Sequence, residues 1–216
     1  MRMRKKPWAA AELANNPKVL GDHRSRRGGW KEYFGNEHPV FIEIGAGKGR
    51  FIIENAAAHQ GVNFVGIEKQ GSVLASAARR AGKDIPNLAF VRADASGIEE
   101  IFAPGEVGRV YINFCDPWPR KKWGKRRLTH RGFLEKYKKL FGGSGELFLK
   151  TDNRELFEFS LSELKEAGFT LRNVTFDLYA DGLKDNIQTE YEEKFSALGI
   201  PICRLEAAWF TPDGPV

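Results

Sequence analysis

From Val40 onward, short runs of β-branched and aromatic residues alternate with longer helix-like stretches. This alternation constrains the fold most, because parallel strands joined by crossover helices form a sheet that is covered on both faces. The strand-like runs are 40–44, 63–67, 88–92, 109–114 and 146–151, and the helix-like stretches are 51–59, 70–81, 130–141 and 154–167. The pattern predicts an α/β fold with a mostly parallel sheet.

The two ends of the chain differ from this middle part. Residues 1–37 are basic and rich in Gly, Asn and Pro, and their lack of apolar periodicity predicts a loosely packed arm. Residues 38–216 are predicted to form one domain, since a chain of 216 residues with 42% hydrophobic content buries one substantial core. Near the C-terminus, 170–178 and 203–210 are strand-like around a helical 189–198, which predicts a closing antiparallel strand pair.

The formal net charge of +6 is concentrated in clusters. Cations gather at 2–6 and 24–27, and the run from Arg120 to Arg131 holds seven cations and no carboxylate. Clusters of this kind, interrupted by Gly, Pro and Trp, are typical of a surface that binds phosphates, although a merely solvated charge run is the alternative.

Other sequence features limit the class of protein. Cys115 and Cys203 match no zinc spacing and lie in apolar segments, which predicts two buried free thiols and no metal. No stretch approaches the roughly 18 apolar residues of a membrane span, and no signal-peptide core follows the N-terminal charges. We therefore expect a cytoplasmic protein without a membrane partner.

A carboxylate stands at or just after the end of each of the five predicted parallel strands. These carboxylates are Glu43, Glu68, Asp94, Asp116 and Asp152. One acid in such a place is commonly a helix cap. Five acids at the carboxyl edge of one sheet, where ligands of doubly wound folds bind, favour a ligand site.

The turn Glu43-Ile-Gly-Ala-Gly-Lys-Gly49 follows the first strand, and Gly45 and Gly47 let a ligand approach the backbone. A phosphate-binding loop needs Ser or Thr after the Gly-Lys pair, but Gly49 stands there. A dinucleotide site stays open because Glu68 lies at the spacing of a ribose-binding acid, although Arg50 occupies the third glycine position. S-adenosylmethionine is cationic and lacks phosphate, so it suits an acidic, glycine-rich pocket best.

The segment Asn113-Phe-Cys-Asp116-Pro-Trp118-Pro-Arg120 runs from a buried strand into a loop stiffened by two prolines. Asp116 is thereby placed at the cofactor edge, where a carboxylate can orient a purine through its N–H groups. Trp118 either stacks on a base or packs against the core. The cations that follow are predicted to engage a nucleic-acid backbone.

These motifs, together with Leu149-Lys-Thr-Asp-Asn153 and Thr189-Glu-Tyr-Glu-Glu-Lys-Phe195, resemble those of the bacterial tRNA (guanine-N7)-methyltransferase family over about residues 38–210. The resemblance implies a Rossmann-like class I methyltransferase fold. It also implies methyl transfer from S-adenosylmethionine to N7 of the guanine at position 46 in the variable loop of tRNA. Whether the enzyme is a monomer or a homodimer is left open.

The resemblance also implies roles for particular residues. Donor binding falls to Glu43, Gly45, Gly47, Glu68, Asp94 and Asp116, and Asp116 is also the expected catalytic residue. Substrate contacts are expected from Arg120, Asp152, Thr189, Glu190, Tyr191 and Glu192, and RNA contacts from Lys122, Trp123, Gly124, Lys125, Arg126 and Arg127.

The chain departs from the family pattern at two places in the basic loop. Position 120 is commonly lysine in the family, and Arg120 offers a planar fork instead of a point charge. Trp123 and Gly124 replace residues that are commonly polar. The alternatives that stay open are a methyltransferase acting on another RNA position or a small molecule, an inactive RNA-binding module, and a dehydrogenase.

Overall fold

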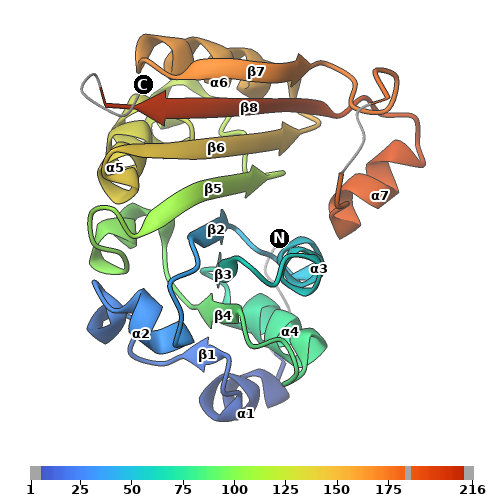
Figure 1. The fold of residues 1–216 in the computed structure, drawn as a ribbon. Coiled ribbons are helices and arrows are strands. Elements are labelled where there is room, and N and C mark those ends of the chain that lie inside the picture. The colour runs from blue at the N-terminus through green and yellow to red at the C-terminus, as the bar shows by residue number, and fades with distance from the viewer. Residues whose placement is uncertain (1–5, 183–185, 212–216) are drawn as a thin grey trace.

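The computed structural model describes residues 6–182 and 186–211, which contain one eight-stranded sheet with helices on both faces (Figure 1). The strands are β1 (Val19–Leu20), β2 (Val40–Ile44), β3 (Asn63–Ile67), β4 (Leu88–Val91), β5 (Val107–Asn113), β6 (Ser144–Thr151), β7 (Thr170–Thr175) and β8 (Cys203–Phe210). The α-helices are α1 (Trp8–Asn15), α2 (Trp30–Phe34), α3 (Arg50–Ala58), α4 (Gly71–Ala81), α5 (Arg131–Phe141), α6 (Arg154–Glu166) and α7 (Glu190–Ser196).

The strand order is β1-β4-β3-β2-β5-β6-β8-β7. Strands β1 to β6 pair in parallel, while β8 runs antiparallel between β6 and β7. The predicted α/β class, the mostly parallel sheet and the C-terminal antiparallel pair are confirmed. The order reverses between β2 and β5, and in doubly wound sheets the crevice at this switch point binds the ligand.

Alternation along the strands divides the core between the two faces. Ile42, Val65 and Val110 pack with α2, α5 and α6 on one face. Phe64 and Phe90 pack with α3 and α4 on the other. Strands buried on both faces explain the nearly continuous apolar runs in the sequence.

The N-terminal segment differs from the predicted loose arm. Its described part contains α1, β1 and α2, and α1 packs against α4 while β1 pairs with β4. Trp30 is fully buried, donates from Nε1 to the Ile101 carbonyl at 3.0 Å and stacks on Phe102 with 5.1 Å between ring centroids. The segment therefore contributes to the core. A two-residue strand and a five-residue helix have no periodicity by which the sequence could reveal them.

Two sequence predictions outside the site have mixed outcomes. Both cysteines are free, but only Cys203 is buried, while Cys115 is half-buried. No helix in the described ranges is long and apolar enough to cross a membrane.

Candidate active site

The glycine turn connects β2 to α3 through residues with left-handed backbone conformation. Gly47 has φ of 57° and Gly49 has φ of 82°. A Cβ atom at Gly49 would lie 2.9 Å from the Cβ of Ala77 on α4, so only glycine fits there. The Gly47 N–H donates to Glu68 Oε2 at 3.2 Å, which links the turn to the end of β3.

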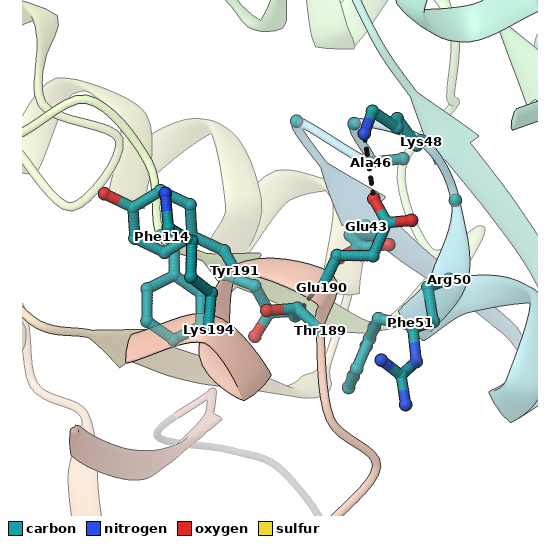
Figure 2. A pocket seen from close by; sticks show the side chains of 14 residues that line it. Glu43, Ala46, Lys48, Arg50, Phe51, Phe114, Thr189, Glu190, Tyr191 and Lys194 are labelled. Atoms are coloured by element: carbon teal, nitrogen blue, oxygen red, sulfur yellow. Dashed lines mark hydrogen bonds and ion pairs between the residues drawn. The ribbon is translucent and has the colours of Figure 1, made fainter. Parts of the chain in front are cut away.

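A cleft of about 400 Å³ opens beside this turn, and Figure 2 shows its wall. We call it the turn cleft. It is lined by the glycine turn, the end of β5 and the start of α7, including Glu43, Gly45, Gly47, Asn113, Phe114, Thr189, Glu190 and Tyr191. An ion pair of 3.7 Å between Lys48 Nζ and Glu190 Oε2 joins the turn to α7 across the cleft.

Glu43 is the most unusual group in the turn cleft. Its side chain is 2% exposed, and Oε1 accepts a hydrogen bond from Asn113 Nδ2 at 2.9 Å. Oε2 is buried and has no hydrogen-bond partner among the described residues. Burial raises the pKa of Glu43 to about 7. A ligand ammonium group in the cleft would supply the missing donor and favour the ionised carboxylate.

A second cleft of about 360 Å³ adjoins the first and shares Gly45, Asn113 and Phe114 with it. We call it the acid cleft, because Glu68, Asp94 and Asp116 line it from the ends of β3, β4 and β5. The strand-end acids are thus gathered at the switch point of the sheet, as expected for a ligand site.

Two of these acids are held by local hydrogen bonds. Asp94 caps the 3₁₀ helix after β4, where Oδ1 accepts from the Ser96 N–H at 2.9 Å. Lys69 Nζ lies 2.7 Å from Asp94 Oδ2, and this contact, followed by the bonds from Ser96, lowers the pKa of Asp94 to about 2. Glu68 Oε1 accepts from the Gln70 N–H at 2.7 Å, so the orientation of its carboxylate is fixed.

Backbone strain flanks Asp116. Phe114 has φ of 50° and Trp118 has φ of 45°, a region that large residues rarely adopt. Phe114 lies between the two clefts, and its ring centroid is 5.1 Å from that of Tyr191. Phe114, the exposed Asp116 and Trp118 all line the acid cleft.

The basic loop, residues 120–127, contains a short 3₁₀ helix, and its side chains contact Trp118 and Trp123. Trp118 and Trp123 meet edge to face at 5.8 Å between centroids. Arg126 lies over Trp118 at 4.8 Å and Arg120 over Trp123 at 4.7 Å. Within the described ranges, no cation of this loop forms an ion pair with a carboxylate, which leaves charge available to an anionic partner.

Arg127 differs from its neighbours in the loop. Its Nε donates to the Pro117 carbonyl at 3.1 Å and its guanidinium to the Trp118 carbonyl at 3.2 Å. The guanidinium also lies over the Phe159 ring at 4.4 Å. These bonds fix the loop that carries Asp116, so Arg127 has a local structural role.

The earlier basic cluster at 24–27 lies elsewhere. Arg24 pairs with Glu100 at 2.6 Å, and Arg27 donates to the Glu99 carbonyl at 2.9 Å. These cations are partly engaged within the fold. From the first cluster only Lys6 lies inside the described residues, and its Nζ donates to Ser76 Oγ at 3.0 Å.

Three residues expected to contact substrate lie outside the clefts. Arg120 lies over the Trp123 ring in the basic loop and lines neither cleft. Asp152 is half-buried after β6 and lines neither cleft. Glu192, in the first turn of α7, is fully buried and lines neither cleft. Asn113, Phe114 and Lys69 contribute to the site without having been singled out by sequence reasoning. A polar Asn113 at the end of a largely apolar strand is a signal that could have indicated its own place in the site.

Comparison with known proteins gives the family. Residues 37–205 match a family described as "Putative methyltransferase". The chain is 48% identical over 209 residues to the tRNA (guanine-N(7)-)-methyltransferase of Geobacillus thermodenitrificans, covering 96% of this chain and 97% of that protein. The chain belongs to the tRNA (guanine-N(7)-)-methyltransferase family. The Bacillus subtilis member is 46% identical over 213 residues, which are 98% of this chain and 100% of that protein.

Solved methyltransferase structures share the fold at low sequence identity. An antibiotic-related methyltransferase superposes with a TM-score of 0.66 at 19% identity, covering 91% of this chain and 98% of that one. A 16S rRNA (adenine(1408)-N(1))-methyltransferase from Catenulisporales acidiphilia, solved with its cosubstrate SAM, gives 0.63 at 17% identity, covering 93% and 97%. The class I methyltransferase fold predicted from the sequence is confirmed.

Proposed function

We propose that this family member transfers a methyl group from S-adenosylmethionine to N7 of a guanine in tRNA, at position 46 of the variable loop. The observation that carries the proposal is the buried Glu43 carboxylate, which has one unpartnered oxygen in a cleft adjoining three further carboxylates. This arrangement suits a ligand with an ammonium group, a ribose and an adenine, and no phosphate.

The two clefts would bind different parts of the methyl donor. Glu43 and the backbone of Gly45 and Gly47 would hold its methionine end in the turn cleft. Glu68 would accept hydrogen bonds from the ribose hydroxyls, and Asp94 would lie at the adenine. When bound, S-adenosylmethionine supplies a methyl group activated by its sulfonium.

Guanine N7 carries a lone pair and no proton, so the chain need not supply a general base. Holding N7 in line with the methyl carbon is therefore the main task of the site. Asp116 would accept from the N–H groups of the guanine edge and offset the positive charge that develops on the base. Phe114 and Tyr191, which face each other at the cleft, offer ring faces for stacking.

The basic loop would supply affinity for the RNA backbone. Lys121, Lys122 and Lys125 are exposed beside the cleft that contains Asp116. Arg120 and Arg126 lie over tryptophan rings, which holds their guanidinium groups in place for phosphate contacts. This division assigns binding to the loop and chemistry to the clefts.

The test is methylation of bulk tRNA by the purified protein with methyl-labelled S-adenosylmethionine, followed by mass spectrometry of the nucleosides. N7-methylguanosine is the expected product, and Asp116→Ala is expected to form none. A different methylated nucleoside, or transfer to a small molecule, would refute the assignment. NADH binding in place of donor binding would favour a dehydrogenase.

A further inference from the structure

A buried lysine is the penultimate residue of β6 (Ser144–Thr151). Lys150 is 5% exposed, and its Nζ donates to three acceptors: Glu192 Oε2 at 2.6 Å, the Ile187 carbonyl at 2.9 Å and Asn186 Oδ1 at 3.1 Å. An ammonium group has three donors, and all three are used. Asn186 and Ile187 belong to the segment that leads into α7, and Glu192 belongs to α7 itself.

The hydrogen-bond acceptor positions of the Glu192 carboxylate are also all occupied. Its side chain is fully buried, Oε1 accepts from the Tyr179 hydroxyl at 2.9 Å and from the Asn186 amide, and Oε2 accepts from Lys150. Oε2 also accepts from the Thr189 N–H at 3.3 Å, while the Glu192 N–H donates to Thr189 Oγ1 at 2.9 Å, which completes a capping box. No acceptor position is left for a substrate base.

Little of α7 is buried against the rest of the described fold. Figure 1 shows α7 standing apart from the sheet, beyond the ends of β5 and β6. Among the residues of α7 only Glu192 is buried. The other ion pairs of α7, from Lys48, Arg50 and Arg80, are solvent-exposed and individually weak.

We propose that Lys150 is a positioning residue for methyl transfer, acting through Glu192 to hold the start of α7 against the glycine turn. Thr189, Glu190 and Tyr191 then line the turn cleft because Lys150 holds Glu192, the residue after them, in place. On this account Glu192 contacts Lys150 and not the substrate. The expected fall in kcat rests on the proposed function, whereas the expected effect on the position of α7 does not.

The direct test is Lys150→Met, which keeps the length of the side chain and removes its charge. We expect kcat to fall about 100-fold, the loss typical of a site misplaced by an ångström. The tRNA Kd should stay within about twofold of the wild-type value because the basic loop is untouched. Hydrogen exchange of the backbone amides in 190–196 should become faster.

The matched control is Arg204→Met. Arg204 lies opposite Lys150 on β8 and is also a largely buried cation, but its partner is Glu206 on the same strand. This variant should keep the wild-type kcat and the wild-type exchange of α7. A folded Lys150→Met protein with wild-type kcat would overturn the proposal, and so would slow turnover with unchanged exchange in α7.

Removing Lys150 alone leaves a buried unpaired carboxylate, which can prevent folding. The double variant Lys150→Met/Glu192→Met removes both charges. It should fold, yet remain slow with fast α7 exchange, and wild-type turnover by it would also overturn the proposal. If the wild-type protein methylates no tRNA, the proposed function fails, while the exchange comparison still decides whether Lys150 holds α7.

Discussion

The clearest quantitative consequence of the structure concerns Glu43. Burial raises its pKa from 4.5 to about 7, and one unit of pKa corresponds to about 1.4 kcal/mol. Ionising Glu43 in the ligand-free protein therefore costs about 3 kcal/mol more than in a solvated carboxyl. A ligand ammonium beside Oε2 offsets this cost, so donor binding should require the ionised form.

The affinity of S-adenosylhomocysteine, which carries the same amino group and does not react, should therefore depend on pH. At pH 6 about one tenth of the Glu43 side chains are ionised, so Kd should be about tenfold higher than at pH 8. Isothermal titration calorimetry at both pH values measures this ratio. Asp94, whose pKa is about 2, stays ionised throughout and adds no dependence of its own.

The control is Glu43→Gln, which keeps the shape of the side chain and cannot ionise. At pH 8 the variant should bind S-adenosylhomocysteine with a higher Kd than the wild-type protein. The Kd of the variant should be nearly equal at pH 6 and pH 8. In the ligand-free protein the raised pKa of Glu43 favours the folded state at low pH, and this contribution is lost as pH rises from about 4.5 to 7. A wild-type Kd that is independent of pH would refute the role given to Glu43.

Three further perturbations test separate parts of the structure. Asp116→Ala should abolish turnover and leave the tRNA Kd within about twofold, because the basic loop supplies the affinity; wild-type kcat would contradict its role. Lys125→Ala/Arg126→Ala should weaken tRNA binding and reduce the slope of log affinity against log salt concentration by about 0.7–0.9 per lost phosphate contact. Arg127→Ala should mainly lower kcat. An equal effect of Arg127→Ala on the salt slope would refute this separation of roles. Trp30→Ala should lower the free energy of unfolding by about 3–5 kcal/mol in urea titrations, and a loss under 1 kcal/mol would mean that the N-terminal segment is not part of the core.

Most of the fold could be predicted because its signals are local. The strands β2, β3 and β4 are buried on both faces, so most of their residues are apolar and the runs can be read from the sequence. The predicted helix at 70–81 agrees closely with α4 (Gly71–Ala81), because its alanine-rich face gives a clear period. Burial of Trp30 was missed because it depends on Phe102, far along the chain.

The site was predictable in position more than in detail. Strand ends of a parallel sheet meet at one edge, so Glu68, Asp94 and Asp116 were expected together and lie together in the acid cleft. Their individual roles stay predictions. Lys150 and Glu192 are separated by 42 positions, and only the folded chain shows that two charged residues are each other's buried partners.

The most direct test of methyl transfer to guanine N7 is methylation of a defined tRNA transcript, compared with the same transcript carrying 7-deazaguanine at position 46. The modified base keeps the Watson–Crick edge and lacks only the N7 lone pair. We expect about one methyl group per unmodified transcript, mapped to guanine 46, and none on the modified one. Equal methylation of both transcripts would contradict this expectation.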